Sequence, residues 1–279
     1  ADMVELPNGN WIMVCLGIRN EENRGSNMGR ETLILPVVWE KEPFWWKETK
    51  YNWPVCNPLT GKIEKQYPYF LPINDSTYEP TKKEYEFQEN TLPLNWIHRR
   101  VSLENSYSLN TKTGYLSMYC LPDTIKERSP YNFIGIKQKE THFETSTTMQ
   151  FNPTINGEEA GLCLIQKDDN YILFDVRHED NENVLRLVIN AKKKNAILQK
   201  DLVMGKKYKN YIELKVILKE NKYHFYYRYQ SNDLWELFDT TASNLLLSEG
   251  YTGSHIGLYA TSNGKKSINF ASFDVFKLN

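Results

Sequence analysis

Residues 211–229 read YIELKVILKENKYHFYYRY, two runs rich in apolar and aromatic residues on either side of the polar stretch 219–222. In residues 211–218, polar and apolar side chains alternate, which is typical of a strand with one face in water. The polar stretch contains Asn221, a residue that favours tight turns, so it predicts a hairpin connection. This segment therefore predicts two antiparallel strands side by side.

Short runs of the same kind recur along the chain from residue 115 onward. Polar turn sequences separate them, among them Asn156-Gly157 and Asn263-Gly264. No stretch has a convincing helical pattern, and many short strands at this spacing indicate a β-sandwich or a β-barrel. We expect residues 85–279 to form one large sandwich of two sheets. The other expected strands are residues 115–120, 131–136, 142–151, 160–166, 171–177, 184–189, 196–203, 234–239, 255–260 and 267–276.

The first 75 residues have a different pattern. Residues 11–16 and 32–39 predict two strands, joined by a polar loop over residues 19–30. Prolines are then dense as far as residue 80, and proline lacks the backbone donor that a strand ladder needs. We therefore expect residues 40–85 to be a connector that lies on other surfaces, with its large aromatic residues packed between domains. These aromatic residues are Trp45, Trp46, Trp53, Tyr67, Tyr69 and Phe70.

Composition excludes several classes of protein. The chain has 34 Lys and Arg against 35 Asp and Glu, a formal net charge of −1. This argues against a nucleic-acid or membrane-surface partner, because both need a clustered basic field. The 7 Trp, 18 Tyr and 12 Phe exclude a disordered chain. No stretch approaches the roughly 20 apolar residues of a membrane helix.

Cysteine and histidine point to no metal centre. The four cysteines lie far apart without a C-x-x-C pair, so three disulfide pairings stay open and we expect buried free thiols. The five histidines are isolated, and no H-x-x-x-H pair occurs. A structural zinc site needs closely spaced ligands, which this sequence lacks.

Residues 28–37 read MGRETLILPV and are followed by Trp39. This G-R-E-T motif resembles the late propeller strands of glycoside hydrolase family 43, the β-xylosidases and α-L-arabinofuranosidases, whose catalytic domain is a five-bladed β-propeller. Residues 53–55 and 60–64 are similar to the segment that leaves that propeller. Each match is short, and their order along the chain is what makes the resemblance specific.

The resemblance extends over about residues 1–70 and 92–279 and implies the domain organisation. It implies an all-β chain in which residues 85–279 form a concanavalin A-like two-sheet β-sandwich, a jelly-roll. Residues 1–75 would hold the last strands of the five-bladed β-propeller and a connector. The stretches similar to the family's C-terminal sandwich are residues 107–109, 114–116, 133–135, 158–162 and 273–276.

The resemblance also implies an activity. Family members hydrolyse xylosidic or arabinofuranosidic bonds in plant-polysaccharide oligosaccharides with inversion. Their three essential carboxylates and a further pocket histidine lie upstream of the G-R-E-T region. A propeller blade takes roughly 40–50 residues, so 75 residues cannot hold five of them. We therefore expect no catalytic residue in this chain, which would be inactive alone and would need the missing propeller portion in cis or in trans.

Arg30 and His255 are the candidate substrate-binding residues. By resemblance, Arg30 points into the sugar pocket, where a guanidinium can donate several hydrogen bonds and lower the pKa of nearby carboxyl groups; the alternative is a surface arginine. Gly29 would let the backbone turn closely. His255 lies in a stretch, residues 251–257, that matches a loop closing the family's pocket with an aromatic side chain, often Phe. It could stack on a sugar or titrate near neutral pH, and the alternative is packing at a strand end.

The remaining acidic pairs have structural interpretations. Residues 158–159 are both Glu and would point to opposite faces of a strand, so we expect them at a turn or an edge. Residues 168–169 are both Asp in a turn and are expected to be solvated. Asp2 and Glu31 are expected to form hydrogen bonds within the propeller blade.

Two other functions stay open on the sequence alone. The sandwich could be a non-catalytic carbohydrate-binding module, or a structural module that orders a homo-oligomer. No organic cofactor is implied, and calcium at a sandwich or propeller site stays open without a ligand motif. The sequence does not choose between xylose and arabinose, or between a cytoplasmic and a secreted or periplasmic location.

Overall fold

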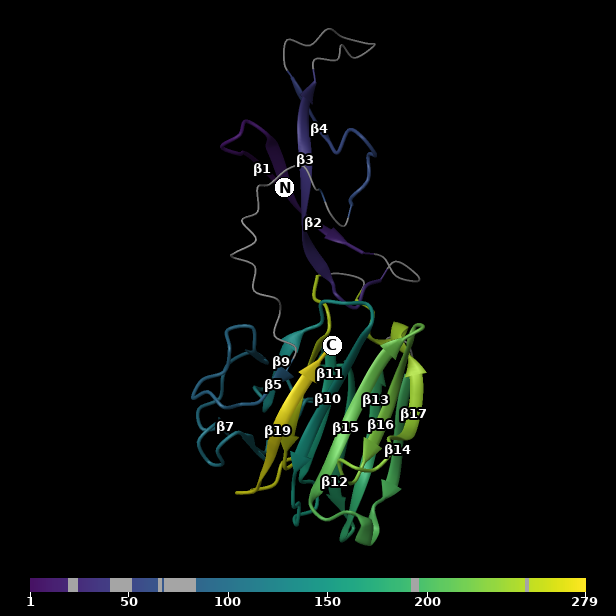
Figure 1. Ribbon diagram of the computed structural model, residues 1–279. Coiled ribbons are helices and arrows are strands. Elements are labelled where there is room, and N and C mark those ends of the chain that lie inside the picture. Colours follow the sequence, from purple (N-terminus) through teal and green to yellow (C-terminus); the bar gives the residue numbers. More distant parts are fainter. Residues whose placement is uncertain (20–24, 41–51, 65–66, 68–83, 192–195, 249–250) are drawn as a thin grey trace. The chain divides into compact units, whose positions relative to one another are not determined.

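The structure is a computed structural model that describes residues 1–19, 25–40, 52–64, 67, 84–191, 196–248 and 251–279 (Figure 1). The chain divides into two compact units, residues 1–19 with 30–81 and residues 20–29 with 82–279. The predicted domain ranges, 1–75 and 85–279, stay a prediction. One segment from within the first range, residues 25–29, packs in the second unit.

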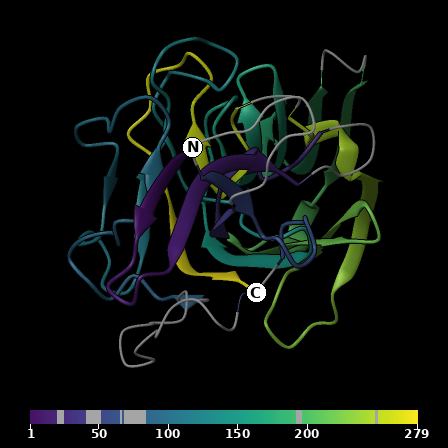
Figure 2. The same ribbon diagram turned by 90° about the horizontal axis from the view of Figure 1, so that it is seen from above.

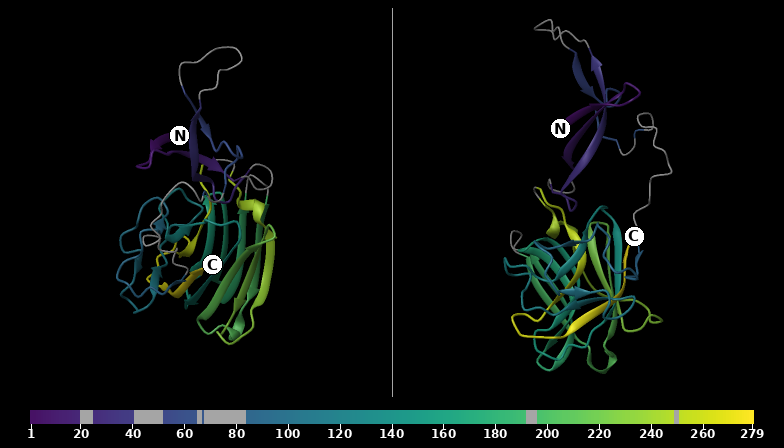
Figure 3. Two further views of the ribbon diagram at one scale, coloured as in Figure 1. Left: turned by 45° about the horizontal axis from the view of Figure 1, so that its top comes forward. Right: turned by 90° about the vertical axis from the view of Figure 1, so that its left-hand side faces the viewer.

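The first unit contains a four-stranded antiparallel sheet in the order β1-β2-β3-β4 (Figure 3). Each strand pairs with the next along the chain, which is the form of a propeller blade. Ile12, Leu35 and Val37 are its buried apolar side chains. Trp11 and Trp39 meet edge to face with ring centroids 5.3 Å apart. The strands are β1 (Asp2–Glu5), β2 (Trp11–Ile18), β3 (Arg30–Glu40) and β4 (Trp53–Cys56).

Strand β4 corrects the expectation that residues 40–85 form only a connector. Pro54 lies within β4, opposite Trp39 of β3. Because β4 is at the edge of the sheet, the backbone donor that proline lacks needs no partner there. Trp53 is 46% exposed. Four of the aromatic residues expected to pack between domains lie outside the described residues: Trp45, Trp46, Tyr69 and Phe70.

The second unit is a sandwich of two antiparallel sheets (Figures 1 and 2). One sheet has eight strands in the order β17-β16-β15-β10-β19-β8-β7, with β5 beside β19. Its strands are β5 (Glu84–Tyr85), β7 (Tyr107–Ser108), β8 (Leu116–Tyr119), β10 (Phe143–Gln150), β15 (Tyr211–Lys219), β16 (Lys222–Arg228), β17 (Glu236–Ala242) and β19 (Phe270–Leu278).

The other sheet has seven strands in the order β14-β13-β12-β11-β18-β9-β6. Its strands are β6 (Ile97–His98), β9 (Phe133–Lys137), β11 (Glu159–Lys167), β12 (Asn170–Glu179), β13 (Glu182–Ala191), β14 (Ala196–Val203) and β18 (His255–Thr261). Two short 3-10 turns, Gly205–Lys207 and Ser243–Leu246, are the helical elements of the described residues. The predicted all-β fold class is confirmed.

The predicted hairpin is present between β15 and β16. Lys219 and Lys222 face each other across it. The two residues between them, Glu220 and Asn221, have φ values of 50° and 57°. Both therefore occupy the left-handed region that the favoured two-residue hairpin turn requires.

The main core lies between the two sheets. Phe174 of β12 is fully buried, and its ring centroid is 5.4 Å from that of Phe225 in β16 and 5.5 Å from that of Phe238 in β17. In β10, the buried side chains alternate with half-buried ones, as the period of two predicts. Removing one large apolar side chain of this kind from water stabilises a fold by about 1.5–3 kcal/mol.

The seven-stranded sheet also carries apolar side chains on its other face. Strand β11 is buried at eight consecutive positions, because alternate residues enter different clusters. Leu162 and Leu164 lie in the core between the sheets, whereas Cys163 and Ile165 belong to a smaller cluster with Tyr131. The four cysteines are free thiols, as predicted. Cys120 and Cys163 are buried as expected, whereas Cys15 and Cys56 of the first unit are only half-buried, so the predicted burial is wrong for these two.

Candidate functional site

Arg30 is the first residue of β3, opposite Ile18 of β2, and its side chain is exposed. Its neighbour Glu31 accepts hydrogen bonds from Arg19 Nε at 2.7 Å and Arg19 Nη2 at 2.5 Å. Successive residues of a strand point to opposite faces, so Arg30 and Glu31 lie on opposite faces of β3. The contacts confirm that Glu31 hydrogen-bonds within its own unit.

Residues 25–29, which we call the strap, lie immediately before Arg30 and pack into the sandwich unit. Ser26 and Ser248 exchange two backbone hydrogen bonds, with N···O distances of 3.1 and 3.0 Å. The Ser254 backbone N–H donates to the Asn27 carbonyl at 2.6 Å. Ser26, Asn27 and Met28 are each 0% exposed. The strap is therefore an integral part of the sandwich rather than a surface loop.

Two glycines allow this close approach. A Cβ atom at Gly253 would lie 2.2 Å from the Met28 carbonyl oxygen, and one at Gly29 would lie 2.3 Å from the Gly253 backbone nitrogen. Gly29 also has a φ of +64°, a conformation that favours glycine. The tight turn expected at Gly29 is confirmed. The sandwich therefore fixes the backbone up to the residue that precedes Arg30.

His255 is the first residue of β18, between Ile165 of β11 and Lys137 of β9. Its Nδ1 atom is buried and has no hydrogen-bond partner among the described residues. Burial, assisted by the positive charges of Arg99 and Lys137, lowers the pKa of His255 to about 4. The imidazole is therefore neutral at neutral pH, and the expectation that it titrates there is wrong. Stacking of His255 on a sugar stays a prediction.

Arg30 and His255 belong to different units of the chain. The segment before His255 is held by polar contacts within the sandwich. Gln166 Nε2 donates to the Thr252 carbonyl at 3.0 Å, and the Gln138 backbone N–H donates to the Ser254 carbonyl at 2.9 Å. Spacing gave no signal for these two glutamines, because each lies at the end of a strand and only the topology brings the strands together.

Asp168 is not the solvated turn residue that the sequence predicts. Its Oδ1 accepts hydrogen bonds from Arg99 and from the Tyr131 hydroxyl, each at 3.4 Å. Its Oδ2 forms an ion pair with Arg100. The reason is topological: residues 99–100 follow the edge strand β6, whose pairing with β9 brings two cations to this turn.

Glu158 lies just after the predicted turn and before β11, but it is fully buried. Burial by itself would raise the pKa of Glu158, but hydrogen bonds from Ser267, Asn269 and the backbone of Thr154 and Ile155 outweigh it and lower that pKa. Each carboxylate oxygen is occupied, so Glu158 joins two loops of the sandwich and is not available as a general acid.

A row of charged residues crosses β12, β13 and β14. Arg186 lies between Asp175 and Asp201 and donates two hydrogen bonds to Asp201, at 2.7 and 2.8 Å. Asp175 is 1% exposed, and neither of its carboxylate oxygens has a hydrogen-bond partner among the described residues. Burial, reinforced by the negative charge of Glu159, raises the pKa of Asp175 well above its usual range. The only sequence signal was an acid within the apolar run 171–176.

The described residues contain neither a candidate metal-binding cluster nor a candidate membrane-spanning helix. No group of three or more His, Cys, Asp or Glu side chains in that part of the chain is placed to hold a metal ion. No helix among the described residues has the length and apolar character needed to cross a membrane. The cofactor prediction, none with calcium left open, stays a prediction.

The two antiparallel sheets of the second unit define a concanavalin A-like sandwich. Residues 84–279 match the family model described as the β-xylosidase C-terminal concanavalin A-like domain. The chain therefore belongs to glycoside hydrolase family 43, and the resemblance seen in the G-R-E-T and sandwich segments is confirmed.

Characterised relatives cover almost the whole chain. It is 30% identical over 282 residues to a xylosidase/arabinosidase of Butyrivibrio fibrisolvens, covering 99% of this chain. It is 28% identical to the non-reducing end alpha-L-arabinofuranosidase BoGH43B of Bacteroides ovatus, again over 99% of this chain. The chain spans about half the length of these relatives, 51% and 50% respectively.

Solved structures are also similar over almost the whole of this chain. The GH43B protein of the Bacteroides ovatus xyloglucan locus superposes with a TM-score of 0.83 at 26% identity, over 100% of this chain and 53% of that one. The GH43 protein BlXynB of Bacillus licheniformis gives a TM-score of 0.83 at 26% identity, over 99% and 52%. Both units of the chain are therefore present together in related glycosidases.

Proposed function

We propose that this chain is the C-terminal part of a glycosidase that hydrolyses xylosidic or arabinofuranosidic bonds in short plant-polysaccharide oligosaccharides with inversion of configuration. In this proposal a propeller portion, in the same polypeptide or in trans, supplies the catalytic carboxylates. Arg30 binds the sugar, and the sandwich walls the active site. The names of the relatives, which include both xylosidases and arabinofuranosidases, support this substrate class.

The anchored strap is the observation that carries the proposal. Arg30 has a long side chain, and an arginine held on a mobile loop would lose conformational entropy on binding a sugar. Here Gly29, the residue directly before Arg30, packs closely against the backbone of Gly253. The sandwich thereby restricts the backbone from which the guanidinium extends. This gives a large non-catalytic domain a physical role in binding.

In this proposal the propeller portion carries out the proton transfers, and Arg30 of this chain binds the sugar. Inverting hydrolysis needs one protonated and one ionised carboxyl group about 6.5–9.5 Å apart, with a water molecule between them and the sugar. A guanidinium carries several N–H donors in a planar fork, so Arg30 suits the binding of hydroxyl and carboxylate groups, and the proton transfers belong to the carboxyl groups. The guanidinium can hydrogen-bond the sugar hydroxyls and favour the ionised form of a neighbouring carboxylate.

The test compares Arg30→Ala with Lys62→Ala, an exposed cation of the same unit, in the protein that carries both this chain and the propeller portion. Hydrogen bonds that involve a charged group contribute about 1.5–3 kcal/mol, so we expect Arg30→Ala to lower kcat/KM on an aryl xyloside or aryl arabinofuranoside by about 10- to 100-fold. Lys62→Ala should have no such effect. Equal activity of the two variants would contradict the role given to Arg30.

The stereochemical part has its own measurement. Proton NMR of freshly released sugar should show the anomer opposite to that of the substrate, before mutarotation mixes the two forms. Release of the same anomer would instead indicate a double displacement through a covalent intermediate. That result would leave the substrate class intact and overturn inversion.

A non-catalytic carbohydrate-binding role of the sandwich is a second candidate function. A mixed polar and apolar cavity on the seven-stranded sheet favours it. This candidate predicts that the chain binds glycans without turnover. A purely structural role, with formation of a homo-oligomer, predicts neither binding nor turnover and a concentration-dependent elution volume.

A further inference from the structure

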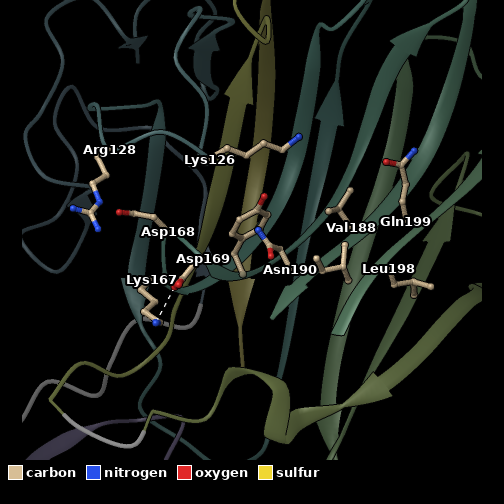
Figure 4. Close-up of a pocket in the computed structure, with 11 residues that line it drawn as sticks. Lys126, Arg128, Lys167, Asp168, Asp169, Val188, Asn190, Leu198 and Gln199 are labelled. Atoms are coloured by element: carbon tan, nitrogen blue, oxygen red, sulfur yellow. Dashed lines mark ion pairs between the residues drawn. The ribbon is translucent and has the colours of Figure 1, made fainter. Parts of the chain in front are cut away.

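A cavity of about 580 Å³ lies against strands β12, β13 and β14 (Figure 4). Tyr171, Asn190 and Ile197 form one row across these strands, because they are direct partners in the strand register. Their neighbours Ile172 and Ile189 belong to the core between the sheets. Since successive side chains of a strand point to opposite faces, the cavity lies on the outer face of the seven-stranded sheet.

The floor of this cavity combines apolar and amide groups. Val188 and Ile197 line it, and Ile197 is 71% exposed despite its apolar character. Asn190, which is half-buried, adds a side-chain amide to this floor. An apolar surface beside an amide suits a sugar ring, which offers C–H groups on one face and hydroxyl groups at its edge.

The charged residues around the cavity leave an excess of positive charge. Asp168 is paired with Arg99 and Arg100, and Asp169 is paired with Lys167 at 2.9 Å. The negative charges of both carboxylates that line the cavity are therefore already neutralised by these ion pairs.

Lys126 and Arg128 line the same cavity and are exposed. Neither side chain forms an ion pair within the part of the chain that the structure describes. Figure 4 shows Lys126 running across the top of the view and Arg128 at its left. Two such cations at the edge of a cavity favour an anionic group on the ligand.

We propose that this cavity binds an oligosaccharide that carries a uronic acid, with the sugar rings over Val188 and Ile197, a hydroxyl at the side-chain amide of Asn190, and the carboxylate at Lys126 and Arg128. The volume is within the range of small-molecule sites, about 300–1,000 Å³. This inference deepens the second candidate function above. The names of the relatives support the carbohydrate class, and the requirement for a carboxylate rests on the charges of the cavity alone.

Isothermal titration calorimetry of the full chain provides the test. The probes are xylotetraose with one glucuronic acid substituent and unsubstituted xylotetraose. We expect the acidic sugar to bind at least about 10-fold more tightly, with an affinity that falls as salt rises, because exposed charge pairs are screened. Equal affinity for the two sugars, or no binding of the acidic one, would overturn the proposal.

Matched variants locate the site. The double substitution Lys126→Ala with Arg128→Ala should abolish the preference for the acidic sugar. Lys265→Ala with Lys266→Ala removes the same charge from an exposed turn and should leave the preference unchanged. An unchanged preference in the first variant, or an equal loss in both, would contradict the site. Displacement of the acidic sugar by equimolar inorganic phosphate would also overturn it, because a simple anion site would then explain the binding.

The Arg30→Ala chain separates this inference from the proposed hydrolysis. Binding retained in that variant supports the cavity whether or not the protein hydrolyses xylosides. Loss of binding there would place the sugar at Arg30 instead and overturn the proposal.

Discussion

Gly253 has no Cβ atom, and this allows the strap to pack closely against its backbone. The Met28 carbonyl oxygen occupies the space that a Cβ atom at Gly253 would need, at a distance of 2.2 Å. Backbone cannot move aside as a flexible side chain can, so the contact depends on glycine. The sequence offered Gly29 as a turn but could not reveal its partner, since more than 200 residues separate the two glycines.

Gly253→Ala is expected to destabilise the protein by about 1–3 kcal/mol, the usual cost of forcing extra volume into a packed region. The control is Gly264→Asn, where nothing lies within 4 Å of the added Cβ and the φ of +82° is in the left-handed region. Asparagine tolerates that region better than other residues. Urea unfolding followed by tryptophan fluorescence measures both variants. Equal stabilities would show that the strap does not pack as described.

The buried His255 leads us to predict that folding stability depends on pH. Its pKa is lowered to about 4 in the folded chain, against about 6.5 for an unperturbed histidine. The unfolded chain therefore takes up the proton first, and folding stability that is present above pH ~6.5 is lost as the pH falls toward 4.

His255→Gln should remove about 1–3 kcal/mol of this pH dependence. His142→Gln, at an exposed position, is the matched control and should retain it. Unfolding free energies measured across this pH interval test the sign. A wild-type protein whose stability is flat or rises on acidification through this range would contradict the burial of a neutral His255.

At the scale of secondary-structure elements, the sequence predicted the strands best. Alternating runs, or short apolar runs between turn sequences, predicted each strand from β8 to β19 to within a few residues. Strands β5, β6 and β7 have two residues each, too few for any periodicity. The strap was missed because its neighbours are distant in sequence. The Asp175–Arg186 row crosses consecutive strands, and it was missed because the sequence does not give the register that places these side chains opposite one another.

The core between the sheets yields a prediction at this scale. Phe174→Ala should cost about 3–5 kcal/mol, because it removes a buried ring and leaves a cavity between the two sheets. Leu234→Ala is the control at a position that is 88% exposed, and it should change stability by less than about 0.5 kcal/mol. Thermal unfolding of the two variants compares them, and similar midpoints would contradict the sandwich core.

At the scale of the whole molecule, different observations support the family assignment and the proposed sugar-binding site. The match of residues 84–279 and the two-sheet fold establish the family. The proposed sugar contact of Arg30 rests on the G-R-E-T motif and the anchored strap. In the proposed function, substrate choice depends on pocket residues of the propeller portion, which is why this sequence left xylose and arabinose open.

The crystal structure of a complex tests the central proposal most directly. It would contain the protein that carries this chain and the propeller portion, bound to xylose or arabinose. We predict an Arg30 Nη atom within about 3.2 Å of a sugar hydroxyl oxygen. A sugar bound in the propeller with Arg30 directed away into solvent would contradict the account.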